Sequence, residues 1–461
     1  MLYKTQNNED GISIIIYVVI IAIIFSAFFQ NYLVVHFILF TVSLLFVLKG
    51  GIRGLYFFTL YTFLQNIFLI AFSPTLTSWD TKLIILYKEI IVYLSAFFYL
   101  AKYQFKNEGI IQKIVLILVA FIFLFNLIRP GAPFNLKLIA IRQLLIPYMG
   151  VYFGYSIATS KIDLLKYMRF YINSLCFLGV IGLFIYQFEP YIIWDSLNYP
   201  QYFFNKNDAS FDTGYLNFYS WDFGPQLKRF VSIIADPIAA AHMVGIALVY
   251  LIVVEKGKSF WKKILMMACA IFCVSKSLIL LFFTIGLVVF YVNIKKKIYK
   301  ILFFSLAIIS IFILFTLATL YVEGLESNTA SGNHLKSLIF AVYNNSFLGN
   351  GLGSAGYLAG VITGQNIEMD ANESFMAMLI TQLGILGATV FYLYFILKIL
   401  QMEKLYHQTN SRIVLFGLIL LTDVILESIV SGSSIAMLGT GLYFIIPGMI
   451  MRNFLVFKSI K

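Results

Sequence analysis

Apolar stretches of about twenty residues recur along the whole chain, separated by short polar connectors. An α-helix rises 1.5 Å per residue, so a stretch of this length crosses the roughly 30 Å hydrocarbon core of a bilayer. The pattern predicts an all-α polytopic membrane protein with about fourteen transmembrane helices, or 12–14 if neighbouring short segments are re-entrant. The predicted spans are 12–29, 31–48, 55–72, 83–101, 112–128, 138–158, 165–187, 233–254, 262–275, 278–294, 300–321, 373–398, 413–430 and 434–456.

Two connectors are much longer than the others, at about 188–232 and about 322–372. If both termini are cytoplasmic, most of the 33 lysines and arginines fall in cytoplasmic connectors, and the outer segments carry a small acidic excess. Basic residues accumulate on the cytoplasmic side of membrane proteins. The distribution therefore predicts cytoplasmic termini and two long extracytoplasmic loops, within a single integral membrane domain that spans residues 1–461.

The composition excludes a soluble protein, because 61% of the residues are hydrophobic and only 12% are charged. A net charge of +12 indicates a nucleic-acid partner only where basic residues gather on one folded face. Here they lie in connectors, so anionic membrane lipids are the expected partners and nucleic acid is not. The three cysteines join no metal-ligand spacing and are interpreted as packing residues. No cleavable signal peptide is expected, because the first apolar segment has the length of a span and lacks a cleavage site.

The first long loop interleaves aromatic residues with aspartates. Rings stack on the C–H faces of sugars and carboxylates accept hydrogen bonds from hydroxyl groups, so a polyhydroxylated ligand is one interpretation. An aromatic belt at the membrane interface is the other. The aromatic residues are Tyr191, Trp194, Tyr199, Tyr202, Phe203, Phe204, Phe211, Tyr215, Phe218, Tyr219, Trp221 and Phe223, and the aspartates are Asp195, Asp208, Asp212 and Asp222.

The second long loop contains the run Gly349-Asn350-Gly351-Leu352-Gly353-Ser354-Ala355-Gly356, which includes a formal G-x-G-x-x-G string. A dinucleotide site requires a strand before this string and a helix after it, within a βαβ unit. The surrounding pattern provides neither, so we exclude that function. The glycines are instead expected to permit a tight loop close to the bilayer or to a bound backbone.

Four motifs follow one another in the second half of the chain, each at or outside the outer end of a predicted span. They are Arg229-Phe230-Val231-Ser232-Ile233-Ile234-Ala235-Asp236-Pro237, Val274-Ser275-Lys276-Ser277, Asn333 to Gly353 ending in Phe347-Leu348-Gly349-Asn350-Gly351-Leu352-Gly353, and Asn372-Glu373-Ser374-Phe375 through Gln382-Leu383-Gly384-Ile385-Leu386-Gly387. In this order and spacing, residues 229–387 resemble the O-antigen polymerase and O-antigen ligase superfamily of bacterial surface-polysaccharide enzymes. The resemblance implies a fold similar to that of the glycosyltransferase-C enzymes.

The chain departs from the family pattern at three places. Lys276 stands where members often carry arginine, so the bidentate geometry of a guanidinium group is missing there. The start of the second loop offers His334 and Lys336 in place of an arginine. Ligases of the superfamily typically place His-Asn where this chain has Asn372-Glu373. The missing histidine favours a polymerase over an O-antigen ligase-type transferase.

The resemblance implies that a growing glycan is transferred from polyprenyl pyrophosphate to a sugar hydroxyl of an incoming lipid-linked repeat of O-antigen or capsule. The site would face the periplasm or exterior of a bacterial cytoplasmic membrane, and no cofactor, ATP or nucleotide sugar is expected. A base must accept the hydroxyl proton, and cations must stabilise the departing pyrophosphate. A single displacement with inversion is the simplest mechanism. The expected protein partners are a chain-length regulator and a flippase.

Glu373 is the predicted base, because it lies where the second loop re-enters the membrane and is partly desolvated there. Alternatively, it is a glutamate that the helix dipole favours at a helix N-terminus. His334, Lys336 and Asp236 are secondary candidates for binding the substrate. The alternatives are exposed loop positions for the first two, and a helix N-cap followed by Pro237 in the first turn for Asp236.

Arg142, Arg229 and Lys276 are predicted to bind the pyrophosphate, since charge-assisted hydrogen bonds to phosphate are strong in a dry site. Lys276 alternatively reaches the outer headgroups. Arg142 alternatively pairs with an intramembrane acid; the candidates are Glu89, Asp423 and Glu427. The last two acids are four residues apart near the outer end of a predicted helix, so they share a face and are expected to point inward. His242 is interpreted as a packed or pore-lining residue.

We expect a metal-independent reaction, because no outer loop has adjacent acidic residues and the first outer connector offers only Gln30 and Asn31. Arginine and lysine would then replace a divalent ion. Two other functions remain open: a flippase or transporter of lipid-linked oligosaccharides, and a scaffold for polysaccharide assembly. Transporters commonly show internal halves of similar topology, which this chain does not.

Overall fold

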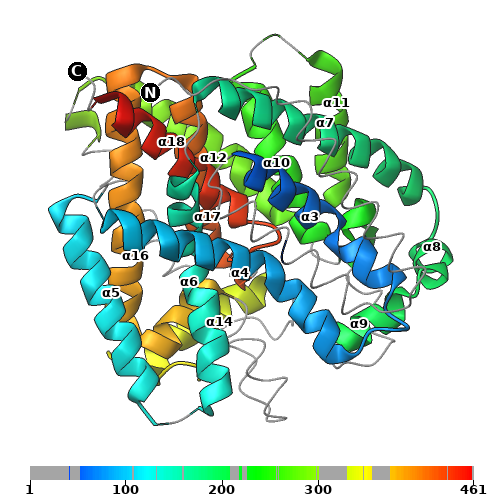
Figure 1. Cartoon of the computed structure of the whole chain (residues 1–461), viewed down its shortest axis with the longest axis horizontal. Helices are drawn as coiled ribbons and strands as arrows, with labels where there is room; N and C mark the ends of the chain where they lie inside the picture. Colours follow the sequence, from blue (N-terminus) through cyan, green and yellow to red (C-terminus); the bar gives the residue numbers. More distant parts are fainter. Residues whose placement is uncertain are drawn as a thin grey trace.

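The structure is a computed structural model of the chain (Figure 1). It describes residues 52–105, 108–130, 132–157, 160–207, 218–220, 226–255, 259–296, 298–300, 330–345, 347–355, 374–432 and 435–458, together with the single residues 41 and 257. The predicted span 12–29, and all but one residue of each of the predicted spans 31–48 and 300–321, lie outside the described residues.

The described residues form a helical bundle, which confirms the predicted all-α class. Its described helices outside the two long connectors are α3 (Ile52–Ala71), α4 (Ser78–Tyr103), α5 (Ile110–Ile128), α6 (Phe134–Ser156), α7 (Lys161–Tyr186), α10 (Pro237–Val253), α11 (Phe260–Cys273), α12 (Lys276–Asn293), α16 (Phe375–Thr409), α17 (Arg412–Val430) and α18 (Gly441–Lys458). Within the described ranges, seven helices are long and apolar enough to cross a membrane: α3, α4, α5, α6, α7, α12 and α16. The chain is therefore a polytopic membrane protein.

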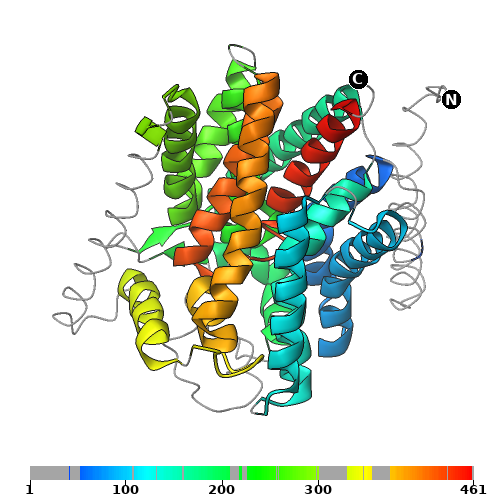
Figure 2. The ribbon, with the colours of Figure 1, turned by 90° about the vertical axis from the view of Figure 1, so that its left-hand side faces the viewer.

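The described parts of both long connectors lie at one end of the bundle, which we call the loop end. The elements there are α8 (Pro190–Ser196), α9 (Tyr199–Asn207), a two-stranded antiparallel pair of β1 (Tyr219–Ser220) and β2 (Leu227–Lys228), the 3-10 helix η2 (Ser232–Ile234) and α14 (Ala330–Asn344). In Figures 1 and 2 the segments at 199–207 and 330–355 lie at the lower end, opposite the C-terminal ends of α16 and α18.

Helices α6 and α18 pack closely because glycines face each other between them. A Cβ atom added at Gly154 would clash with the carbonyl oxygen of Ile445, and one at Gly448 would clash with that of Val151. Small residues let two membrane helices bring their backbones together, which strengthens packing where lipid removes the usual hydrophobic driving force. This contact fixes the position of α6, which carries a residue of the candidate site.

Helix α16 reverses direction at Gly384, whose φ of 75° and ψ of 174° are not helical. The ring centroids of Phe375 and Phe391 are 5.7 Å apart, whereas sixteen residues of straight helix would separate them by about 24 Å. The residues before Gly384 therefore fold back along the start of the longer arm, which continues to Thr409. The apolar pattern predicts one continuous span at 373–398, which is wrong because the helix reverses at Gly384. Hydropathy does not show the reversal, because the short arm before Gly384 is as apolar as the arm after it.

The glycine-rich run 347–355 binds along its backbone to the break in α16. The N–H groups of Asn350 and Gly351 donate to the carbonyl oxygens of Thr381 and Gln382 at 2.7 and 3.1 Å. The break in the helix leaves these carbonyl oxygens without helical N–H partners, and the N–H groups of the loop supply the missing hydrogen bonds. The glycines have positive φ angles of 73° at Gly349, 97° at Gly351 and 79° at Gly353. This confirms their expected role in a close approach to another backbone segment.

Replacing Gly384 with alanine is expected to lower the free energy of unfolding by roughly 1–3 kcal/mol. The new Cβ would clash with the carbonyl oxygen of Phe347, and φ at this position is positive. Thermal unfolding in detergent measures the change. Gly286→Ala on α12 is the matched control, because a Cβ there meets no atom within 4 Å and alanine favours a helix. Equal melting temperatures for the two variants would contradict a strained reversal at Gly384.

Five aromatic rings of the first long loop form a small core that holds α8 and α9 against α3 and α4. They are Trp194, Tyr199, Tyr202, Phe203 and Phe218, all at most 8% exposed. The rings of Trp194 and Phe218 stack with their centroids 5.7 Å apart. Because protein covers these faces, they are not available to stack on a sugar or to line a membrane interface. Phe211, Tyr215, Trp221 and Phe223 lie outside the described residues.

A buried ion pair lies towards the opposite end of the bundle. The Nζ of Lys398 donates to both carboxylate oxygens of Glu108 at 2.7 and 2.6 Å and to the hydroxyl of Tyr155 at 2.8 Å. Both charged side chains are 0% exposed. The sequence pattern places both residues in or beside cytoplasmic connectors. The structure instead buries them, because α16 continues beyond Lys398 and packs against α5.

Candidate anion-binding site

Charged side chains gather where α4, α6 and α9 meet beside the start of α10. Lys88 and Glu89 are neighbours on α4 and are 3% and 5% exposed. On α6, the Nε of Arg142 lies 3.2 Å from Oε2 of Glu89. Lys206 of α9 and Asp236 at the start of α10 also act electrostatically on Lys88. We call these five residues the α4–α6 cluster.

Helix α3 supplies the polar contacts that hold the cluster in place. Lys88 donates from Nζ to Oε1 of Gln65 at 2.8 Å, which is its one acceptor within the described ranges. The next residue, Asn66, donates to the carbonyl oxygen of Ile234 at 2.7 Å and accepts from the hydroxyl of Tyr202 at 3.3 Å. These bonds tie α3 to η2 and α9, so the loop end is fixed around the ammonium group of Lys88.

Arg142 is partly accessible, with 33% of its side chain exposed. The hydroxyl of Tyr93 donates to its carbonyl oxygen at 2.6 Å and fixes α6 against α4. Its Nε is close to Glu89 but is not aligned for a hydrogen bond. Neither Nη atom has an acceptor among the described residues. This pair confirms the alternative prediction that Arg142 pairs with an intramembrane acid, which is Glu89. The N–H groups on the two Nη atoms of Arg142 can still donate hydrogen bonds to a second anion.

The cluster contains three basic and two acidic side chains, so its formal charge is positive. Removing charges from water is costly unless they are paired. An anion bound at Arg142 would complete the charge balance and accept the unused hydrogen bonds. Phosphate suits such a site, because its oxygens match the planar fork of a guanidinium group.

Arg229 and Lys276 lie at a second place on the loop end. The Nε of Arg229 donates to the carbonyl oxygen of Cys273 at 3.3 Å, and its backbone N–H donates to the carbonyl of Phe218 at 2.8 Å. Lys276 is the first residue of α12 and follows Cys273 by three positions. Both side chains are partly buried. The contacts of Arg229 hold the β-pair beside the junction of α11 and α12.

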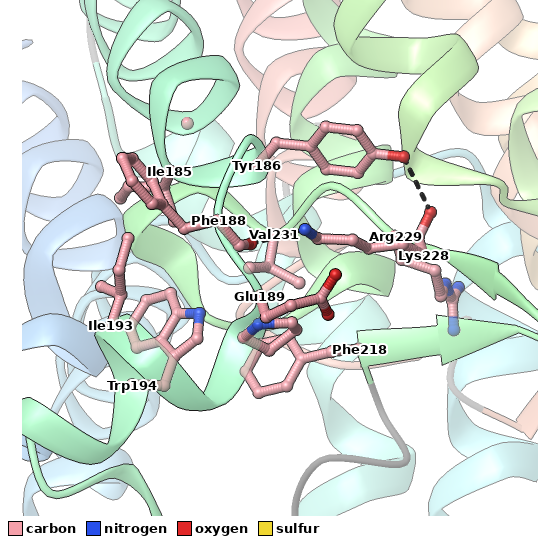
Figure 3. A pocket seen from close by; sticks show the side chains of 12 residues that line it. Ile185, Tyr186, Phe188, Glu189, Ile193, Trp194, Phe218, Lys228, Arg229 and Val231 are labelled. Atoms are coloured by element: carbon pink, nitrogen blue, oxygen red, sulfur yellow. Dashed lines mark hydrogen bonds between the residues drawn. The ribbon is translucent and has the colours of Figure 1, made fainter.

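A small pocket beside Arg229 is lined by α7, α8 and the β-pair (Figure 3). The Nζ of Lys228 donates to the carbonyl oxygen of Phe188 and lies 5.1 Å from the ring centroid of Tyr186. Glu189 places a carboxylate in the lining and accepts from the hydroxyl of Tyr219 at 2.9 Å. Desolvation and the nearby Glu189 raise the pKa of Tyr219 to about 12, so this hydroxyl remains a donor at neutral pH. The carboxylate of Glu189 would oppose an anion bound in this pocket.

The remaining predicted site residues fall in three places. Asp236 accepts hydrogen bonds from the N–H groups of Ile238 and Ala239 at 3.0 and 2.9 Å, which confirms the N-cap interpretation. His334 and Lys336 lie on α14, where Lys336 is partly buried. The predicted base Glu373 lies outside the described residues. Ser374, which follows it, donates from Oγ to the carbonyl oxygen of Ile429 at 2.6 Å.

The structure brings Arg142 and Asp236 into one cluster through Lys88, which the sequence reasoning missed. A signal for it was present, because Lys88 and Glu89 stand side by side inside the predicted span 83–101. Charged residues within a span mark binding or transport sites by default. From the sequence, Glu89 is predicted only as a possible partner of Arg142, and Lys88 is assigned no role.

Within the described ranges, no group of three or more His, Cys, Asp or Glu side chains is arranged to hold a metal ion. Comparison with protein-family models, with curated proteins and with solved structures gives no match for the chain.

Proposed function

We propose that the protein is a glycosyltransferase of bacterial surface-polysaccharide synthesis, a polymerase of polyprenyl-pyrophosphate-linked oligosaccharide repeats. The growing glycan would leave its lipid pyrophosphate and join a sugar hydroxyl of an incoming lipid-linked repeat. The motifs between 229 and 387 support this class of enzyme, and the many apolar helices suit a lipid-linked substrate.

The proposal rests on the guanidinium group of Arg142, which lies on a helix that can span the membrane. About a third of this side chain is exposed, and neither of its Nη atoms has a hydrogen-bond acceptor among the described residues. A cation at that depth is costly unless an anion offsets it, and Glu89 offsets only part of the cluster's charge. The pyrophosphate of a polyprenyl carrier is an anion that reaches this depth, because its lipid tail anchors it in the bilayer.

In the proposed reaction, the acceptor oxygen forms a bond to the anomeric carbon while the bond from that carbon to the pyrophosphate oxygen breaks. Arg142 and Lys88 would stabilise the charge that develops on the departing pyrophosphate. Glu373 would take the proton of the acceptor hydroxyl, so that the leaving group departs as an anion. Arg229 and Lys276 would hold phosphate oxygens as the substrate enters at the loop end. No step requires a divalent ion or another cofactor.

The proposed location is the bacterial cytoplasmic membrane, with cytoplasmic termini and the loop end facing the periplasm or exterior. The proposed partners are a flippase, which would supply lipid-linked repeats to that face, and a chain-length regulator.

The test is incubation of the purified protein in detergent with the authentic polyprenyl-pyrophosphate-linked repeat in the presence of EDTA. The expected result is a ladder of products on a gel, made by the wild type and abolished by Glu373→Gln. The matched control is Glu189→Gln, which removes a carboxylate from the pocket beside Arg229 and is expected to leave the ladder intact.

Two outcomes would contradict the proposal. A ladder that appears only after Mg²⁺ or Mn²⁺ is added would exclude the metal-independent reaction. The absence of a ladder, together with movement of the intact lipid-linked repeat across the bilayer of reconstituted vesicles, would identify a transporter instead.

A further inference from the structure

A second group of titratable side chains lies between α10 and α17, outside the site described above. The Nε2 of His242 lies 2.8 Å from both carboxylate oxygens of Glu427. Asp423 stands one helical turn from Glu427 on α17 and also acts electrostatically on His242. The three side chains are 2%, 3% and 1% exposed, so no bulk water reaches them.

One polar atom of this group, Oδ1 of Asp423, lacks a hydrogen-bond partner within the described part of the chain. Buried polar atoms are rarely left unsatisfied, and an ionised carboxylate in an apolar interior is the most costly case. The buried carboxylate of Asp423 therefore requires a hydrogen-bond partner or a counter-charge that the described side chains do not provide.

The titratable groups around Asp423 show that one positive charge is missing from this group of side chains. Glu427 and His242 act electrostatically on it, and the hydroxyl of Thr284 on α12 interacts with it while donating to the carbonyl oxygen of Leu280 at 2.9 Å. The remaining titratable groups are tyrosines, since Tyr443 of α18 interacts with both acids and Tyr171 of α7 interacts with Tyr443. Within the described ranges, neither a lysine nor an arginine acts on these groups. One imidazolium can balance one carboxylate, so the second acid is left without a counter-charge.

We propose that His242, Asp423 and Glu427 form a buried proton-binding site, in which His242 and Glu427 make an ion pair and Asp423 holds a proton at neutral pH. The proton neutralises the second carboxylate and turns one of its oxygens into a hydrogen-bond donor.

The site lies just inside the loop end. His242 follows the cap of α10 by six residues, and Glu427 is in the last turn of α17, two residues before the carbonyl that Ser374 binds. Loss of the Asp423 proton would leave two carboxylates facing one imidazolium, and their repulsion would separate α10 from α17 at this end. Proton occupancy thereby controls the packing beneath the short arm of α16.

The proposal is tested by infrared difference spectroscopy of the purified full-length protein in detergent at neutral pH, in buffers with sodium or with choline as the cation. The expected result is the C=O band of a protonated carboxyl group in the wild type, equal in both buffers. Asp423→Asn is expected to abolish the band. Asp195→Asn, at an exposed position of α8, is expected to leave it unchanged.

The wild-type spectrum can overturn the proposal even if a variant does not fold. Absence of the band at neutral pH would overturn the proposal, as would a band that appears only when sodium is withdrawn, because both carboxylates would then bind a metal cation. A band retained by Asp423→Asn but abolished by Glu427→Gln would place the proton on the other acid and contradict the assignment.

Discussion

Replacing Arg142 with alanine is expected to slow chain extension by about 100-fold or more, because a cation that stabilises a leaving group typically contributes a factor of this size. Initial rates from product ladders measure the effect. Arg412→Ala, at an exposed position at the start of α17, is the matched control and is expected to retain the wild-type rate.

The variant Arg142→Ala also leaves Glu89 buried without its partner, so a loss of activity needs a separate check for misfolding. Glu89→Gln/Arg142→Ala removes the unpaired charge and is expected to restore the melting temperature but not the rate. If the double variant recovered both stability and rate, Arg142 would be a structural partner of Glu89 and would not bind pyrophosphate.

Replacing Lys398 with methionine is expected to lower the free energy of unfolding by roughly 3–5 kcal/mol. The substitution leaves Glu108 fully buried without the ammonium group that now bonds both of its oxygens. Thermal unfolding in detergent checks the prediction. Glu108→Gln is expected to destabilise by a similar amount, because Lys398 is then left without a counter-charge.

The double variant Lys398→Met/Glu108→Gln is the control that distinguishes the interaction between the two charges from the effect of each charge on its other neighbours. Replacing both charges removes the desolvation penalty together with the attraction, so the double variant is expected to be closer to the wild type than either single variant. Additive losses in the double variant would show that the two charges do not stabilise each other.

Local sequence patterns predicted those features that depend on neighbouring residues. The i, i+4 spacing of Asp423 and Glu427 predicted that both acids share a buried face, and both are at most 3% exposed. Asp236 before Pro237 predicted a helix cap, and the hydrogen bonds of α10 confirm it. Length and hydropathy predicted helices that match the described ones, because a membrane requires internally bonded backbone.

Contacts between distant segments could not be predicted in the same way. The partner of Arg142 is 53 residues earlier in the chain and that of Lys398 is 290 residues earlier, and hydropathy does not reveal which helices pack together. The reversal at Gly384 was also hidden, because both arms of α16 are apolar. The aromatic rings around Trp194 gave no sign of whether protein, lipid or sugar would cover them, since each environment favours the same residues.

The proposed function requires the α4–α6 cluster to bind a lipid pyrophosphate. The measurement is the equilibrium binding of labelled polyprenyl pyrophosphate to purified protein in detergent, compared between the wild type and Glu89→Gln/Arg142→Ala. We expect saturable binding by the wild type and a dissociation constant at least about 10-fold higher for the double variant, a change of about 1.4 kcal/mol. Equal dissociation constants in two proteins of equal melting temperature would contradict it.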